Sequence, residues 1–445
     1  MGGLVVAAPA SHSGKTVFTL GLLRLLARRG LAPRPAKAGP DYIDPAFLRE
    51  AAGAACVNLD AFAQSPETIA GLGARLASPG GIGVLEGVMG LFDGAEAERG
   101  STADLAQILG WPVVLVVDAS AQGASAAAVV EGFHRHRAGL PLAGVVFNRT
   151  GGARHAELLR DAMARALPEV PVLGAIPRDS ALEIPERHLG LVQASEHAAL
   201  AKFLDAAADA IEKNINTSAL LEIAEHVRPP TGGTARGDFS TVTAPPPILP
   251  LGQRIAIAAD VAFAFTYALT LEGWRAAGAE LSFFSPLADA PPAASADAVY
   301  LPGGYPELHA GRLAGATRFT DGLRRAASAG AVVFGECGGY MVLGEGLTDA
   351  DGRRHRMAGL LPLETSFAER RLHLGYRRAK ALAASPLGPA GSTFAGHEFH
   401  YASINGEGPG EALFETADAS GRLLGTTGLR VGAVMGSFVH LIARN

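Results

Sequence analysis

A cysteine flanked by glycines in the C-terminal half of the chain is the residue best suited to nucleophilic chemistry. Cys337 lies in the segment 335–339 (GECGG), directly after the apolar run 331–334. A sharp turn between strand and helix would project its sulfur clear of the backbone, and the glycines would relieve the strain of such a turn. Because a helix N-terminus stabilises a thiolate, we expect a lowered pKa for Cys337. The pattern predicts a nucleophile, and the alternative is an inert buried thiol.

Three other segments contain residues that would complete a thiol site. His440 follows a strand-like apolar segment and is the expected general base. Gly303 and Gly304 follow another apolar run and would offer backbone N–H groups to an oxyanion. A polar cluster with His397 and Glu398 is expected to support the site. Together these residues indicate hydrolysis of an acyl or amide group.

A second set of candidate functional residues lies near the N-terminus. Ser13-Gly14-Lys15-Thr16 follows the apolar run 4–8 and precedes an apolar periodic stretch. In such a loop the backbone N–H groups bind a polyphosphate, the lysine neutralises its charge, and the threonine hydroxyl coordinates Mg²⁺. Pro9 stands where the usual motif has its first glycine. The alternative is a strand–helix turn that is merely rich in serine and glycine.

Three acidic residues fall where a magnesium nucleotide should bind. Asp41 is in the turn-rich segment 37–45, Glu86 lies just beyond a predicted buried strand, and Asp93 is in the glycine-rich loop that follows. Ligands of open α/β sheets bind at the carboxyl ends of the strands, and Mg²⁺ prefers oxygen ligands. We expect Thr16, Asp41 and Glu86 to bind Mg²⁺, and Glu86 and Asp93 to act in catalysis. The alternative is that these acids cap their own loops.

The nucleotide base needs a pocket beside the phosphate loop. Asn148 and Arg149 end a predicted strand, and Pro177 ends the next one. The Asn148 amide could bind a base edge, Arg149 could stack or reach phosphate, and the turn at Pro177 could form the other wall. We therefore assign these three residues, with Ser13 to Thr16, to ATP binding.

Short apolar runs alternate with helical segments up to about residue 225, which predicts an α/β fold with a parallel sheet. The predicted strands are 4–8, 82–85, 113–117, 142–147 and 172–176, and helices include 17–29 and 155–166. A Pro/Gly/Thr-rich stretch then predicts a linker, and a second α/β series includes strands at 254–258, 298–301 and 332–334. The expected domains are 1–228 and 253–445, joined by a linker at 229–252.

Composition excludes several classes of protein. The chain has 445 residues, 48% of them hydrophobic, which is enough for two or three domains. Its net charge of −5 argues against a nucleic-acid partner, and two cysteines cannot form a disulfide framework. No apolar run approaches the ~18 residues of a membrane span, and the first apolar run leads into the phosphate loop rather than a cleavage site. We expect a cytoplasmic enzyme with no membrane partner.

The combination of a phosphate loop and a thiol site is most simply explained by an ATP-driven, glutamine-fed amide synthetase. The chain resembles the cobyrinic acid a,c-diamide synthases, including those of hydrogenobyrinic acid, along essentially its whole length. The motifs that carry this resemblance are 13–16 (SGKT), 39–45 (GPDYIDP), 86–94 (EGVMGLFDG), 301–307 (LPGGYPE), 335–341 (GECGGYM) and 396–401 (GHEFHY).

The resemblance implies an N-terminal domain similar to dethiobiotin synthetase and a C-terminal class I glutamine amidotransferase domain. It implies that ammonia, freed from glutamine at Cys337, reaches the first domain, where ATP activates the a and c acetate groups of a corrin ring as acyl phosphates. Tyr42, Ile43 and Asp44 are assigned to the corrinoid polycarboxylate. The cofactors expected are ATP, as co-substrate, and Mg²⁺, and a homodimer is compatible with the sequence.

One position departs from the class I pattern, and several substrates stay open. Class I amidotransferases typically carry Glu two residues after the histidine, where this chain has Ile442. The orientation of His440 must therefore come from elsewhere. The alternatives are cobalt-free hydrogenobyrinic acid, which composition weakly favours, cobyrinic acid, a nickel tetrapyrrole, and the reaction of cobyric acid synthase. A regulatory or partitioning ATPase is the alternative from another class, but it leaves Cys337 and His440 without a role.

Overall fold

The computed structural model describes residues 2–96, 99–183, 186–187, 190–191, 194, 199–225 and 248–445. The chain forms two compact units, 1–242 and 243–445, and each is described by itself. Most of the predicted linker, residues 229–247, lies outside the described residues.

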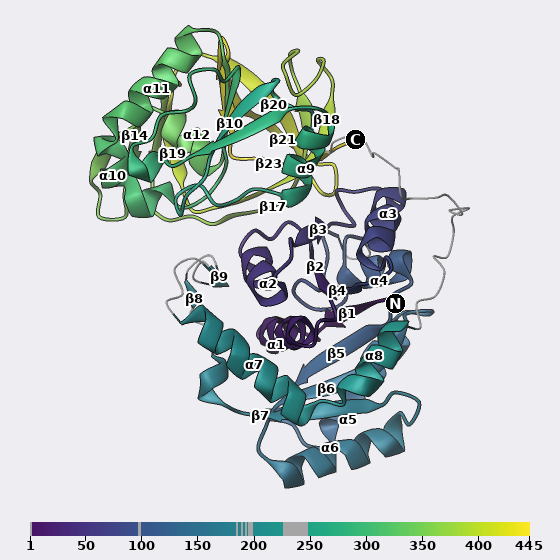
Figure 1. Ribbon diagram of the computed structural model, residues 1–445. Helices are drawn as coiled ribbons and strands as arrows, with labels where there is room; N and C mark the ends of the chain where they lie inside the picture. The colour runs from purple at the N-terminus through teal and green to yellow at the C-terminus, as the bar shows by residue number, and fades with distance from the viewer. Residues whose placement is uncertain are drawn as a thin grey trace. The chain divides into compact units, whose positions relative to one another are not determined.

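The first unit is built on a parallel sheet of seven strands within its described residues (Figure 1). Each strand pair is parallel, and the central strands are buried on both faces, as their continuous apolar sequences require. In spatial order the strands are β3 (Val57–Leu59), β2 (Pro33–Ala38), β4 (Ile82–Glu86), β1 (Gly3–Ala7), β5 (Val113–Asp118), β6 (Leu142–Thr150) and β7 (Val172–Pro177).

Helices cover this sheet. They are α1 (Lys15–Arg28), α2 (Asp44–Ala52), α3 (Pro66–Leu76), α4 (Thr102–Leu109), α5 (Ser125–His136), α6 (Ala153–Ala166), α7 (Leu200–Asn214) and α8 (Thr217–Glu225), with a short helix η1 (Ser180–Leu182) and a small hairpin of β8 (Glu186–Arg187) and β9 (Gly190–Leu191). Helices α1 and α7 pack together (Figure 1), and the Arg24 Nε atom lies 2.8 Å from Asp205 Oδ1 across that contact. Helix α1 therefore packs against α7 as well as against the sheet.

The second unit has a mixed sheet of ten strands in its described part. The pairings from β11 to β22 are parallel, and those from β22 to β23 are antiparallel. In spatial order the strands are β11 (Glu280–Phe284), β10 (Arg254–Ala258), β12 (Ala298–Leu301), β13 (Val332–Glu336), β22 (Val434–Ser437), β21 (Leu423–Val431), β20 (Glu411–Asp418), β17 (His373–Ala381), β18 (Thr393–His400) and β23 (His440–Arg444).

A smaller sheet and several helices complete the second unit. The small sheet runs β15 (Arg354–Arg356), β14 (Gly346–Thr348), β16 (Leu363–Ser366) and β19 (Ser403–Glu407). The helices are α9 (Ala268–Ala276), α10 (Ala310–Gly315), α11 (Thr317–Ser328) and α12 (Gly338–Leu343), with short helices η4 (Pro286–Ala288) and η5 (Pro306–His309).

Both units have the α/β class that the sequence predicts, but some elements differ. The predicted helix 17–29 begins two residues earlier, at Lys15. Ile248 and Leu251, expected in the linker, are buried in the core of the second unit, and the Trp274 Nε1 atom donates to the Ile248 carbonyl at 2.9 Å. The second unit therefore begins to pack before residue 253.

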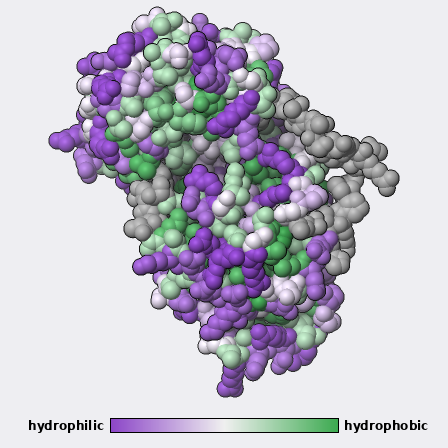
Figure 2. All heavy atoms as spheres, in the orientation of Figure 1, coloured by the Kyte–Doolittle hydropathy of each residue, from purple (hydrophilic) through white to green (hydrophobic). Residues whose placement is uncertain are grey.

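The described helices include none that is long and apolar enough to cross a membrane. On the face seen in Figure 2, hydrophilic side chains are interspersed with small hydrophobic patches.

Candidate active sites of the two units

Cys337 occupies a strained turn between β13 and α12. Its φ of 46° and ψ of −103° lie outside the ordinary regions for a residue with a side chain, and such strain is typical of a nucleophile elbow. Its N–H donates to the Ser437 carbonyl at 2.8 Å, which fixes the turn to the end of β22. A Cβ on Gly339 would lie 1.9 Å from the Leu301 carbonyl oxygen, so only glycine fits there. The glycines of the motif therefore serve close packing around the thiol.

His440 and the loop after β12 lie against this elbow. A Cβ on Gly303 would lie 2.4 Å from His440 Cε1, and a Cβ on Gly338 would lie 3.0 Å from the Gly304 nitrogen. The fold thus brings the expected base, the expected oxyanion-hole glycines and the thiol turn together. His440 itself is buried, with 1% of its surface exposed.

The two supporting residues on β18 have different surroundings. His397 pairs in register with His440 across β18 and β23, and their ring centroids are 5.0 Å apart. Glu398 accepts a 2.8 Å hydrogen bond from Arg377 Nε on the neighbouring strand β17. His397 therefore packs directly on the expected base, whereas Glu398 holds an ion pair beside the site.

The expectation of a lowered thiol pKa is wrong. Burial raises the pKa of Cys337, and the nearby carboxylate of Glu307 raises it further, while the Gly338 N–H opposes these effects only in part. Glu307 was not assigned a role from the sequence. Burial, together with His397 and His400, holds the pKa of His440 well below its ordinary value. The resting pair is therefore a neutral thiol beside a neutral imidazole, which is the form that can accept the thiol proton.

The phosphate loop joins β1 to α1 as predicted. Gly14 adopts a φ of 86° directly before the helix, and the Asn148 Nδ2 atom donates to the Ser13 carbonyl at 3.0 Å. The Asn148 amide group thereby secures the loop. A cavity of about 600 Å³ lies beside the loop and is lined by Lys15, Thr16, Asn148, Arg149, Pro177 and other residues of the first unit.

Arg149 is held at the edge of this cavity by two acceptors. Its Nη1 atom lies 2.7 Å from the His12 carbonyl oxygen and 2.6 Å from Asp118 Oδ2. Asp118 ends strand β5, and its part in the site is not evident from the local sequence. The pair ties the ends of two neighbouring strands to the phosphate loop.

A buried ion cluster lies under the loop, and its central cation was not foreseen as a site residue. Lys37 Nζ on β2 lies 2.8 Å from Glu86 Oε1 and also donates to Asp44. Thr16 Oγ1 donates to the same Glu86 oxygen at 2.8 Å. Burial would lower the pKa of Lys37, but the carboxylates of Asp44, Glu86 and Asp41 raise it well above its ordinary value. Lys37 is therefore a permanently charged partner of these acids.

The other two acids named from the sequence, Asp41 and Asp93, accept hydrogen bonds from backbone N–H groups. Asp41 Oδ1 accepts the N–H groups of Ile43 at 2.8 Å and Asp44 at 3.1 Å. Asp93 is exposed, and its Oδ2 accepts the Gly90 N–H at 2.8 Å. In both cases the carboxylate caps its own loop, which is the alternative to a role in Mg²⁺ binding or catalysis.

The residues assigned to the corrinoid lie at the start of α2. Ile43 is buried, Tyr42 is half-buried, and Asp44 pairs with Lys37. Burial and the Asp44 charge raise the pKa of Asp41 to about 7, whereas Lys37 lowers that of Asp44 despite its burial. Asp44 is thus the ionised member of this neighbouring pair.

The residues named for Mg²⁺ include an unsatisfied buried oxygen. The Oε2 atom of Glu86 is buried and has no hydrogen-bond partner among the described residues. The described part of the chain has no group of three or more His, Cys, Asp or Glu residues that could hold a metal ion. Mg²⁺ bound with a nucleotide commonly uses one or two carboxylates and takes its other oxygens from phosphates and water. A single free carboxylate oxygen beside Thr16 fits that coordination.

Comparison with known proteins defines the class of each unit. Residues 4–192 match the family model described as a CobQ/CobB/MinD/ParA nucleotide binding domain. Residues 254–445 match that of a CobB/CobQ-like glutamine amidotransferase domain. The chain is therefore an enzyme that combines a nucleotide-binding domain with a glutamine amidotransferase domain.

Full-length relatives narrow the class to a family. The chain is 55% identical to the hydrogenobyrinate a,c-diamide synthase of Brucella anthropi, over 99% of this chain and 98% of the relative. It is 53% identical to that of a Sinorhizobium species, over 99% of each chain, and 51% identical to that of Rhodobacter capsulatus, over 99% and 98%. The chain belongs to the hydrogenobyrinate a,c-diamide synthase family and is a glutamine-hydrolysing amide ligase.

Proposed function

We propose that this enzyme uses ATP and glutamine to amidate the a and c acetate side chains of hydrogenobyrinic acid. The observation that carries the proposal is the presence, in one chain, of a thiol elbow beside a buried His440 and a phosphate loop beside the Thr16–Glu86 contact. The similarity to hydrogenobyrinate a,c-diamide synthases supports the cobalt-free substrate over cobyrinic acid.

In the proposed glutaminase reaction, His440 takes the proton from the Cys337 sulfur, and the sulfur attacks the amide carbon of glutamine. The oxygen of the tetrahedral intermediate is held by the N–H groups of Gly303 and Gly304. The carbon–nitrogen bond then breaks, and His440 returns the proton to the departing nitrogen, so that ammonia leaves. Attack by water on the thioester releases glutamate and restores the thiol. We assign this half of the reaction to the domain 253–445.

In the proposed synthetase reaction, an oxygen of the corrin carboxylate attacks the γ-phosphorus of ATP and ADP leaves. Ammonia then attacks the carbon of the acyl phosphate, and inorganic phosphate leaves. Activation is needed because an ionised carboxylate has no oxygen that can depart readily. We assign this half to the domain 1–228.

The residues of the first unit have five roles in this proposal. Ser13, Gly14 and Lys15 bind the phosphates, and Asn148, Arg149 and Pro177 border the nucleotide. Thr16, Asp41 and Glu86 would hold Mg²⁺, which neutralises phosphate charge when bound. Tyr42, Ile43 and Asp44 lie on the corrinoid side, and Glu86 and Asp93 belong to the carboxylate-activation region. The residues in this assignment are Ser13, Gly14, Lys15, Thr16, Asp41, Tyr42, Ile43, Asp44, Glu86, Asp93, Asn148, Arg149 and Pro177.

The test is incubation of the purified enzyme with hydrogenobyrinic acid, ATP, Mg²⁺ and glutamine, with products followed by mass spectrometry. We expect conversion to the diamide, and Lys15→Ala should abolish this conversion by removing the charge that neutralises the phosphates. Parallel reactions contain cobyrinic acid, a nickel tetrapyrrole, or the a,c-diamide that cobyric acid synthase would extend. Faster turnover of any of these would contradict the substrate assignment. ATP hydrolysis without amidation of any substrate would favour the regulatory ATPase.

A further inference from the structure

The residue that orients His440 cannot be found at the position where class I amidotransferases usually have it. That position is Ile442, an aliphatic residue that is buried in β23. A general base of this kind works well only when a second group fixes its ring and stabilises the imidazolium that forms. The structure therefore has to supply this group from another strand.

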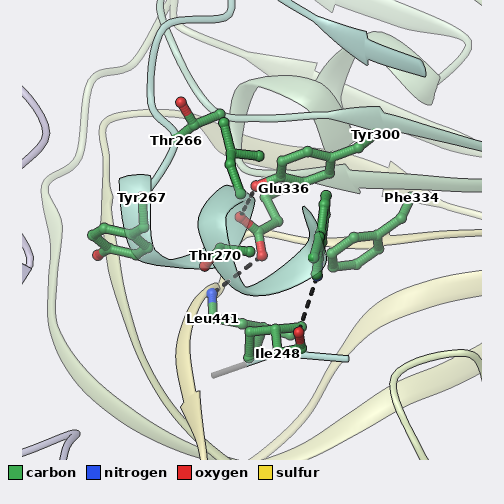
Figure 3. Close-up of a pocket in the computed structure, with 10 residues that line it drawn as sticks. Ile248, Thr266, Tyr267, Thr270, Tyr300, Phe334, Glu336 and Leu441 are labelled. Carbon is green, nitrogen blue, oxygen red and sulfur yellow. Dashed lines mark hydrogen bonds between the residues drawn. The ribbon is translucent and has the colours of Figure 1, made fainter. Parts of the chain in front are cut away.

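Glu336 approaches His440 from strand β13, immediately before the thiol. Its Oε2 atom lies 4.0 Å from the Nδ1 atom of His440, and both side chains are buried, with 6% and 1% of their surfaces exposed. Figure 3 shows the carboxylate in a small pocket between Tyr300 and the backbone of Leu441. The Tyr300 hydroxyl donates to Oε2 at 2.7 Å, and the Leu441 N–H donates to Oε1 at 3.2 Å.

These two donors fix the direction of the carboxylate. One comes from the side chain of a neighbouring strand, β12, and the other from the residue that directly follows His440. The Leu441 contact ties Glu336 to the same strand that carries the histidine. The carboxylate is therefore held in a fixed direction relative to the strand that carries His440, as the positioning of a catalytic base requires.

We propose that Glu336 is the positioning residue of His440, in place of the missing glutamate of strand β23. The inference rests on the proposed function, because it assigns His440 as the base of the glutaminase reaction. With Nδ1 directed at Glu336, the Nε2 atom remains to accept the thiol proton. The negative carboxylate then stabilises the imidazolium while Cys337 is acylated.

The distance in the resting structure is longer than a hydrogen bond by about 1 Å, and catalytic contacts of resting enzymes commonly shorten in the substrate complex. His397 also packs on His440, but a second imidazole supplies no negative charge. Glu336 is thus the carboxylate that the described structure places at Nδ1.

The pH dependence offers a readout that a purely structural role would not change. Burial raises the pKa of Glu336 to about 7, although the contacts with Tyr300 and the Leu441 N–H oppose the shift. The titratable groups that face it are Tyr300 on β12, His440 on β23, the adjacent Cys337, and Tyr267 across the pocket. Glu336 ionises near neutrality, so the glutaminase rate of the intact site should fall as pH decreases through about 7. Burial also raises the pKa of Glu307, which lies near Cys337, to about 7, so the part of the decline that Glu336→Gln removes is the part assigned to Glu336.

The experiment compares Glu336→Gln, Glu336→Asp and Thr270→Val in the full chain. Thr270 lines the same pocket, and its buried hydroxyl has no hydrogen-bond partner in the described structure, so Thr270→Val is the matched control. We expect Glu336→Gln to lower the glutaminase kcat by about 10²- to 10⁴-fold with KM for glutamine nearly unchanged. Glu336→Asp should recover part of the rate, and Thr270→Val should retain it.

Two further readouts separate this role from misfolding and from failure of the proposed function. Glu336→Gln should keep ammonia-dependent amidation, and its glutaminase kcat should decline less near pH 7 than that of the unmodified enzyme. A glutaminase rate within about threefold of the unmodified enzyme, or an unchanged pH profile, would overturn the role of Glu336. An unmodified enzyme that hydrolyses no glutamine would instead overturn the proposed function.

Discussion

The hydroxyl of Thr16 donates a 2.8 Å hydrogen bond to Oε1 of Glu86, a residue 70 positions further along the chain. Thr16 belongs to the phosphate loop, and Glu86 ends strand β4. Lys37 Nζ lies 2.8 Å from the same oxygen. The phosphate loop is therefore linked to a buried ion cluster, and changes in that cluster should affect the two activities of the enzyme differently.

Replacement of Glu86 by Gln should reduce amidation by at least ~100-fold, because it removes a carboxylate proposed to bind Mg²⁺ beside the phosphates. Glutamine hydrolysis at Cys337 should stay near its normal rate. Both rates and the melting temperature are measured for each variant. The control is Glu50→Gln, because Glu50 is an exposed residue of α2. A lower melting temperature with normal amidation would mean that Glu86 has only a structural role.

Replacement of Gly14 by Ala should weaken ATP binding by about tenfold or more, since the phosphate-binding N–H groups need the present loop shape. A Cβ at this position would lie 2.0 Å from Asn148 Nδ2, in a backbone conformation with φ of 86°. Gly30→Ala is the matched control, because Gly30 has a φ of 71° and open space around it. Calorimetric titration with ATP compares the two variants. Equal affinities in both would show that crowding at Asn148 does not shape the loop.

Replacement of Lys37 by Met should destabilise the first unit by about 3–5 kcal/mol, because it leaves the buried carboxylates of Asp44 and Glu86 without their cation. Urea denaturation measures the free energy of unfolding. The exposed Lys202→Met on α7 provides the comparison and should change stability little. A loss below about 1 kcal/mol for Lys37→Met would contradict the view that this cation holds the cluster together.

Glu336 should make the stability of the second unit depend on pH. Its folded-state pKa of about 7 lies above the ordinary value of 4.5, so the folded protein keeps the proton over a range where the unfolded chain has released it. The free energy of unfolding should therefore decrease as pH rises from about 4.5 to about 7 and change no further from this cause above that range. Glu336→Gln should lack this decrease and be the more stable protein at pH 8. Parallel curves for the two proteins from pH 5 to pH 8 would contradict the shift.

The parts of the structure that follow from local sequence were predicted well. The apolar run before Ser13 and the run before Cys337 each predict a strand that ends at a loop with candidate functional residues. These strands and loops were predicted correctly because residues that are neighbours in the sequence specify them. Strand β2 was missed because it contains Pro33 and Pro35, which are rare in interior strands. The antiparallel strands from His373 onward carry many half-buried residues and give no continuous apolar run.

Site features that depend on distant residues could not be foreseen from the sequence. Lys37 is typical of a surface residue by type, and only the fold surrounds it with acids. The raised pKa of Cys337 depends on burial and on Glu307, which no local motif reveals. Glu336 and Leu441 are 105 positions apart, and their contact forms where β13 pairs with β22, the strand that directly precedes β23 in the chain. Local patterns thus indicate candidate reactive residues, while the fold determines their burial, their partners and their pKa values.

Replacement of Cys337 by Ala tests most directly whether one thiol feeds ammonia to a separate synthetase site. Cys56→Ala removes the other buried thiol, in the first unit, and serves as the control. Amidation of hydrogenobyrinic acid is measured with glutamine and, separately, with a high concentration of ammonium salt. We predict that Cys337→Ala loses the glutamine-dependent reaction and keeps the ammonia-dependent one, while Cys56→Ala keeps both. Loss of both reactions in a folded Cys337→Ala protein, or retention of the glutamine-dependent one, would contradict the account.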